Sequence, residues 1–215
     1  AAYGIPLGEP YLFGFGASDP RKNTPRLLEA YAGYRQAAGR QAWGLVMVGR
    51  GPLDEGLQRR AQEIDGVVFA GFQQSEQLPA YYGLASCLVL PSVSETWGLV
   101  VNEAMAAGLP VLVSHRCGCV PELVRSGWNG YLCDPLDIAG MTRTMAVISS
   151  PAADIDAMGA ASRLIVVLYT PETWAQGLGD CIERTLARAQ EPVEEAASRW
   201  PGVFKVEKQP RAAKP

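Results

Sequence analysis

Long apolar runs, a net basic charge and a regular set of cysteines are all absent from this chain of 215 residues. No apolar stretch approaches the roughly 20 residues that a membrane-spanning helix needs, and the N-terminus lacks the charged and apolar regions of a signal peptide. The net charge of −3, with 19% charged residues, gives no positive field for nucleic acid or for an anionic membrane face. We therefore expect a soluble, intracellular protein that does not bind nucleic acid.

The cysteines and the single histidine also indicate neither a disulfide framework nor a metal site. Five cysteines at irregular spacing are not typical of a disulfide scaffold in a chain this long, so reduced thiols are expected. Cys117 and Cys119 form a Cys-x-Cys, but neither their spacing nor the number of nearby ligands matches a structural zinc module. His115 is expected to end a strand rather than to act as a catalytic base. No metal ligand is assigned.

Apolar runs alternating with amphipathic segments make up most of the chain. Its 48% apolar content is enough for one sizeable core. The alternation predicts a doubly wound, mostly parallel α/β sheet of about six strands with Rossmann-like topology and helices on both faces. Strands are predicted at 11–16, 43–48, 67–69, 87–90, 111–113 and within 127–135, and helices at 24–37, 76–84, 98–108, 137–148, 153–168 and 171–190.

Composition divides the chain into three stretches. Residues 1–10 contain two prolines and two glycines and are predicted to be a linker. Residues 11–190 carry the periodic segments and are expected to form one domain, in which Thr24 and Ser75 are predicted to cap helices. Residues 191–215 have scattered charges and prolines without periodicity, which predicts a partly disordered tail.

Residues 86–133 carry most of the functional information, because they predict a strand, a loop, a helix and a second strand in succession. Glycine at Gly98 lets a ligand approach the backbone closely. The amides of Leu99 and Val100 would point out of the helix N-terminus, where the helix dipole favours an anion. The sequence therefore predicts a phosphate site at the start of this helix.

A carboxylate flanks this predicted phosphate site on each side. Glu95 lies in the loop at the carboxyl end of a strand, where it could accept hydrogen bonds from sugar hydroxyls. Glu103 lies one helical turn beyond Leu99 on the same face, where it could bind the diol of a ribose. An isolated glutamate pair more often caps and solvates a surface helix, so the interpretation depends on the surrounding sequence.

That surrounding sequence resembles a known family. The segment ETWGLVVNE at 95–103, followed by AMAAGLPV and PELVRSGWNGYL, resembles the Glu-x7-Glu signature of family 4 glycosyltransferases, which have the GT-B fold. The resemblance spans 11–190 and implies the C-terminal, donor-binding half of such an enzyme. It implies a nucleotide-diphosphate-sugar donor, retention of anomeric configuration, no cofactor and no obligatory metal, with a glycan or lipid-linked acceptor as in polysaccharide biosynthesis.

The resemblance also assigns a first loop that holds the donor diphosphate. Segment GASDPRKNTPRLLEAYA resembles a family loop in which a Gly-Arg pair is followed by a Lys. Gly16 and Lys22 match, but Ala17 stands where the family has arginine and offers no guanidinium contact to phosphate. Arg21 or Arg50 could supply a second cation, although Arg21 is expected to diverge from its neighbour Lys22.

The remaining site residues follow from the same resemblance. Glu95 and Lys22 are the expected catalytic residues, with Glu95 orienting the sugar while Lys22 and the helix-end amides stabilise charge on the leaving diphosphate. Trp97 belongs to the donor-binding segment. Gln73 lies where the family contacts the nucleotide base, and an ordinary polar loop residue there is an equally open interpretation.

GT-B enzymes place their acceptor site in an N-terminal half that these 215 residues do not contain. We expect a partner domain in cis or in trans and little activity without it. A cytoplasmic location is expected, and contact of the missing half with the inner membrane face is an open alternative. A non-catalytic nucleotide-sugar binding or regulatory module is the first alternative, favoured by Ala17 and the absent half. A nucleotide-sugar epimerase of related GT-B fold would fit the fold but not the signature.

Overall fold

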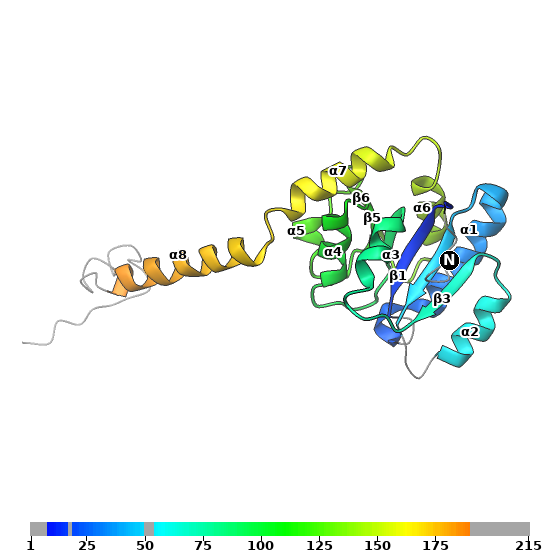
Figure 1. The fold of residues 1–215 in the computed structure, drawn as a ribbon, viewed down its shortest axis with the longest axis horizontal. Coiled ribbons are helices and arrows are strands. Elements are labelled where there is room, and N and C mark those ends of the chain that lie inside the picture. Colours follow the sequence, from blue (N-terminus) through cyan, green and yellow to red (C-terminus); the bar gives the residue numbers. More distant parts are fainter. Residues whose placement is uncertain (1–7, 17–18, 50–53, 190–215) are drawn as a thin grey trace, which may run out of the picture. The chain divides into compact units, whose positions relative to one another are not determined.

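The computed structural model describes residues 8–16, 19–49 and 54–189. Its centre is a parallel sheet with strand order β3-β2-β1-β4-β5-β6 (Figure 1). The strand order changes direction between β1 and β4, which is the switch point where such sheets bind ligands. This arrangement confirms the doubly wound α/β fold predicted from the sequence. The six strands are β1 (Tyr11–Phe15), β2 (Gly44–Val48), β3 (Val67–Gly71), β4 (Cys87–Leu90), β5 (Val111–Ser114) and β6 (Gly130–Cys133).

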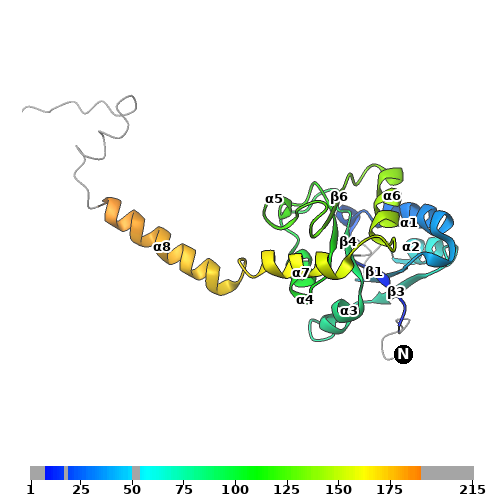
Figure 2. The ribbon, with the colours of Figure 1, turned by 90° about the horizontal axis from the view of Figure 1, so that it is seen from above.

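Helices cover both faces of the sheet (Figures 1 and 2). One face is covered by α1, α2 and α6, and the other by α3, α4, α5 and α7. The described α-helices are α1 (Thr24–Ala38), α2 (Asp54–Gln62), α3 (Leu78–Leu84), α4 (Leu99–Ala107), α5 (Val120–Leu123), α6 (Ile138–Ile148), α7 (Ile155–Val166) and α8 (Pro171–Ala189), with short 3-10 helices η1 (Pro20–Lys22) and η2 (Gly39–Gln41).

Each strand contributes to two cores, because successive side chains of a strand point to opposite faces of the sheet. Leu12 packs with α1 and α6, whereas its neighbour Phe13 packs with α3 and α4. The ring of Phe13 stacks on Tyr81 at a centroid distance of 5.7 Å and meets Tyr82 edge to face at 5.2 Å. The hydroxyl of Tyr11 donates to the carbonyl of Tyr81 at 2.6 Å. These contacts fix α3 on β1 and set the position of Tyr82.

Two predicted helix caps are wrong. The N-cap of α1 is Asn23, in the left-handed region with φ 62°, and not Thr24, whose hydroxyl is buried without a hydrogen-bond partner. Asparagine tolerates this conformation better than most residues do. Helix α3 begins at Leu78 with Gln77 as N-cap, so Ser75 lies ahead of it and donates to the Glu76 carboxylate at 3.4 Å.

Helices α2 and α5 are absent from the sequence prediction. α2 has Gly56 in its interior, and glycine disfavours a helix by about 1 kcal/mol relative to alanine. α5 spans only four residues, too few to show a helical period.

The chain separates into two compact units, 1–168 and 169–215. The sheet and α1 to α7 belong to the first unit. The described part of the second unit is 169–189 and consists mostly of α8, in which Trp174, Leu178, Ile182 and Leu186 are exposed at four-residue spacing. None of the helices that the structure describes has the length and apolar character needed to cross a lipid bilayer.

Candidate functional site

The candidate site lies at the carboxyl ends of β1 and β4, beside the switch point of the sheet. Parallel strands bring the loops that follow them to one edge, so segments far apart in sequence meet there. The loop after β1 carries Gly16 and Lys22, and the loop after β4 carries Glu95, Trp97 and Gly98. The structure brings these two loops into direct contact.

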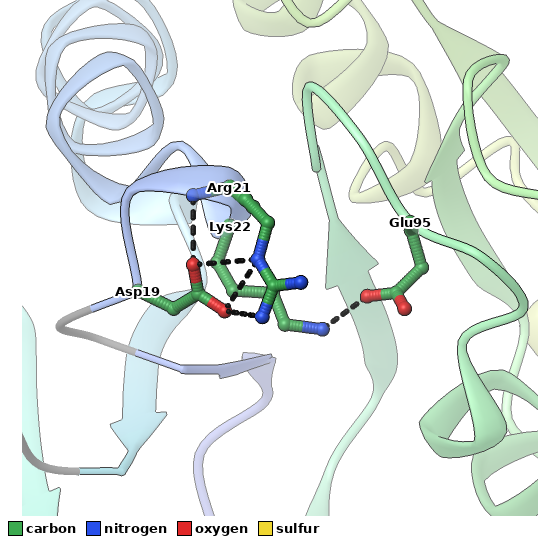
Figure 3. Close-up of polar contacts among 4 residues, drawn as sticks. All are labelled: Asp19, Arg21, Lys22 and Glu95. Carbon is green, nitrogen blue, oxygen red and sulfur yellow. Dashed lines mark hydrogen bonds and ion pairs between the residues drawn. The ribbon is translucent and has the colours of Figure 1, made fainter.

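Lys22 and Glu95 form an ion pair across the two loops (Figure 3). Their side chains are 19% and 18% exposed, so the pair is largely shielded from water yet reachable by a ligand. Gly16 makes room for it, because a Cβ at this position would lie 2.5 Å from Lys22 Cγ. The two residues expected to be catalytic therefore face each other.

Hydrogen bonds to the backbone hold these loops together. The Val93 amide donates to the Arg21 carbonyl at 2.8 Å. The buried side chain of Asn23 donates to the carbonyls of Pro91 at 3.1 Å and of Pro135 at 2.6 Å. Asn23 thus ties the loop after β1 to the loops after β4 and β6, and sequence reasoning missed it. Its only signals are its place next to Lys22 and the tolerance of asparagine for positive φ.

Arg21, one of the two candidates for a second cation, is engaged by an acid on its own loop. Its guanidinium donates to both carboxylate oxygens of Asp19, at 2.8 to 3.2 Å. These hydrogen bonds hold the pKa of Asp19 below its usual range. Ala17 and Arg50 lie outside the described residues.

Helix α4 points its N-terminus at the same region. Gly98 is its N-cap with φ 100°, a conformation that glycine adopts without strain. Intrahelical bonding begins with the amide of Val101, which donates to the carbonyl of Gly98 at 2.8 Å. The amides of Leu99 and Val100 lie ahead of that first bonded turn, and Leu99 is 68% exposed. This geometry suits an anion at the helix start.

The indole of Trp97 fixes the start of α4 from within. Its Nε1 donates to Asn102 Oδ1 at 2.8 Å, and its ring is half-buried against the core. Trp97 therefore supports the helix start in this structure.

Glu103 lies further along α4 and has a partner from α3. The hydroxyl of Tyr82 donates to Glu103 Oε2 at 2.5 Å. Burial and this carboxylate raise the pKa of Tyr82 well above its usual value, so the hydroxyl keeps its proton. Tyr82 is not among the site residues predicted from the sequence. Its ring is buried, and its hydroxyl reaches Glu103.

Two cavities are lined in part by the predicted site residues Gly16, Gln73 and Glu103. One of about 220 Å³ lies at the ends of β1 to β3 and is lined by Phe15, Gly16, Val48, Gly49, Phe72, Gln73 and Leu78. A second of about 530 Å³ lies between α3 and α4 and is lined by Ser75, Leu78, Pro79, Tyr82, Gly83, Glu103 and Ala107. Leu78 lines both cavities. Gln73 donates to the carbonyl of Ala70 at 2.6 Å, which orients its side chain amide at the smaller cavity.

The turn after β5 supports the Glu95 loop from behind. The amide of Gly118 donates to the Glu95 carbonyl at 2.9 Å, and that of Cys119 donates to the Trp97 carbonyl at 3.2 Å. A Cβ on Gly118 would lie 1.9 Å from the Thr96 carbonyl oxygen, so only glycine fits.

The cysteines of this turn are buried thiols. Burial raises the pKa of Cys117 to about 12 and that of Cys119 to about 11. Within the described ranges, no three His, Cys, Asp or Glu side chains are grouped as a metal site would require. His115 directly follows β5, with Nδ1 3.1 Å from the Cys133 carbonyl.

The six-stranded parallel sheet with helices on both faces is a fold of the GT-B class. The family is shown by sequence. Residues 1–163 match the family described as "Glycosyl transferases group 1", and the chain belongs to that family.

Relatives in sequence and structure agree with this assignment. The GDP-mannose-dependent alpha-(1-6)-phosphatidylinositol monomannoside mannosyltransferase of Mycolicibacterium smegmatis is 33% identical over 154 residues, which cover 67% of this chain and 40% of that protein. A sucrose-phosphate synthase from Thermosynechococcus elongatus superposes with a TM-score of 0.71 and 29% identity, over 86% of this chain and 47% of that one.

The Anabaena protein HepE, solved in complex with UDP, has a TM-score of 0.66 and 21% identity, over 79% of this chain and 48% of that one. Its likeness shows the fold alone. The chain spans less than half the length of the curated relatives that it matches.

Proposed function

We propose that this chain is the donor-binding half of a retaining glycosyltransferase that takes a nucleotide-diphosphate-sugar. The observation that carries the proposal is the Lys22–Glu95 pair beside the N-terminus of α4. A cation and a helix N-terminus together suit a diphosphate, and an adjacent carboxylate suits sugar hydroxyls. We assign no metal ion to the reaction.

Each part of the donor has a proposed partner along the site. The diphosphate binds Lys22 and the amides of Leu99 and Val100, which stabilise the charge that builds on it as the sugar leaves. Glu95 orients the sugar hydroxyls. Glu103 accepts hydrogen bonds from the ribose, and the base enters the cavity beside Gln73.

The name of a sequence relative supports a hexosyl donor, because the mycobacterial relative is named for GDP-mannose. We propose transfer of a hexose to a glycan or lipid-linked acceptor bound by a second domain, in cis or in trans. A cytoplasmic location, with membrane contact through the second domain, goes with this proposal, as does low activity of the chain alone.

A non-catalytic nucleotide-sugar binding module is the second candidate. The engagement of Arg21 by Asp19 favours it, because this arginine is then not free to act on the diphosphate. A binding module would bind the donor but transfer nothing when an acceptor domain is supplied.

Both candidate functions require the chain to bind a nucleoside diphosphate. Calorimetry of the 215-residue chain with UDP, GDP and ADP tests this binding. At least one of them should bind, and Lys22→Gln should weaken that binding. Arg40→Gln is a matched control. Arg40 is exposed and lies in η2, just before β2, so it is at the amino ends of the strands and away from the site at their carboxyl ends. A chelator should leave binding unchanged. A folded sample that binds none of the three at millimolar concentration would refute the proposal.

A further inference from the structure

The ion pair joins two groups that the proposed function gives to different parts of the donor. Lys22 belongs to the diphosphate and Glu95 to the sugar, yet each is the other's partner when no ligand is bound. A donor therefore has to replace this contact as it binds.

The pair is built into the backbone. The Val93–Arg21 hydrogen bond and the Asn23 side chain hold the two loops against each other. Behind Glu95, the Gly118 amide fixes its carbonyl. These contacts lie within the chain and involve no ligand, so they hold Lys22 beside Glu95 before a donor binds.

In the cluster formed by Asp19, Arg21, Lys22 and Glu95, no second cation is placed to pair with Glu95 if Lys22 leaves it. Arg21 is held by Asp19 through three side-chain hydrogen bonds (Figure 3). If the diphosphate takes Lys22 away, the Glu95 carboxylate, only 18% exposed, is left beside a polyanion. The hydroxyls of the transferred sugar can satisfy that carboxylate as donors. A bare nucleoside diphosphate lacks this sugar, and its ribose hydroxyls are assigned to Glu103.

We propose that Glu95 competes with the diphosphate for Lys22, so that the site discriminates against a bare nucleoside diphosphate and in favour of a nucleotide-diphosphate-sugar. This inference rests on the proposed function and deepens it. After transfer the sugar has left, Glu95 returns to Lys22, and the product diphosphate is released more readily. From the sequence, Glu95 is assigned to the sugar alone.

Glu95→Gln tests the competition, because glutamine keeps the shape and removes the charge. The probe is whichever of UDP, GDP and ADP binds the wild-type chain, together with the glucose or mannose derivative of the same nucleotide. The bare diphosphate should bind about three- to tenfold more tightly to Glu95→Gln, on the scale of a partly buried ion pair. The nucleotide-sugar should bind no more tightly. Glu63→Gln should change neither affinity, because Glu63 is exposed and precedes β3 at the amino ends of the strands, away from the site.

A double-mutant cycle separates competition from simple charge repulsion. In a Lys22→Gln background, Glu95→Gln should no longer tighten binding of the bare diphosphate, because the contested cation is gone. Continued tightening there would mean repulsion alone and would overturn the inference. Unchanged or weaker diphosphate binding by folded Glu95→Gln, with wild-type binding intact, would overturn it while the proposed function stands. A wild-type chain that binds neither probe would overturn both.

Discussion

At the scale of single residues, Glu103 has its position set before any ligand arrives. Tyr82 is anchored in the aromatic cluster on β1 and donates its hydroxyl to one carboxylate oxygen. A carboxylate has about four acceptor sites, so Glu103 can keep this bond and still accept from a ribose diol. Tyr82 thereby holds the carboxylate in one orientation and lowers the entropy lost on binding.

Replacing Glu103 should weaken binding of the bare nucleoside diphosphate. A hydrogen bond to a charged group contributes about 1.5 to 3 kcal/mol, so Glu103→Ala should reduce affinity roughly ten- to a hundredfold. Calorimetry with the bare diphosphate measures the effect, and Glu63→Ala serves as the control. An affinity within twofold of wild type, in a folded variant, would show that Glu103 does not contact the nucleotide.

At the scale of elements, the turn after β5 fixes the loop that carries Glu95. Gly118→Ala should force the Thr96 carbonyl to move and destabilise the protein by about 1 to 3 kcal/mol, with weaker nucleotide-sugar binding. Gly56→Ala in α2 is the matched comparison. No other group lies within 4 Å of a Cβ there, so alanine should stabilise the helix by about 0.5 to 1 kcal/mol. Urea unfolding of both variants measures the change in the free energy of unfolding, which should be a loss for Gly118→Ala and a gain for Gly56→Ala. The same change in both variants would contradict the argument.

The sequence predicts elements better than it predicts their contacts. The strands and α4 are recognisable because short apolar runs and a glycine at each end of the helix are local signals. The Lys22–Glu95 and Tyr82–Glu103 contacts join residues 73 and 21 positions apart, and they depend on how loops and helices pack. No local pattern reports such packing. The cap at Asn23 was missed for the same reason, since its amide is held by carbonyls from two other loops.

At the scale of the whole molecule, buried cysteine thiols should make the stability of the fold fall at alkaline pH. Burial raises the pKa of Cys117 and Cys133 to about 12, from 9.0 for an exposed thiol. Below pH 9 these thiols are neutral in both states and leave stability unchanged. Above pH 9 the unfolded chain releases protons that the folded chain keeps, so the free energy of unfolding should fall as pH rises toward 12.

Urea unfolding at pH 8 and at pH 10.5 measures this loss. Cys117→Ala should reduce the difference between the two pH values, because one buried thiol no longer titrates. Cys181→Ala is the control, since Cys181 is exposed. A pH dependence that is the same in all three proteins would show that these thiols do not govern it.

The hydrogen bond from Asn23 to the Pro135 carbonyl spans 112 residues of sequence. Contacts at such separations form late in folding, because closing a long loop is entropically unfavourable until intervening structure exists. The first loop of the site can therefore reach its final geometry only after the last strand of the sheet has been added. A refolding chain should acquire helical signal well before it acquires affinity for a nucleotide, and a ribosome must release the segment beyond β6 before the nascent protein can hold one.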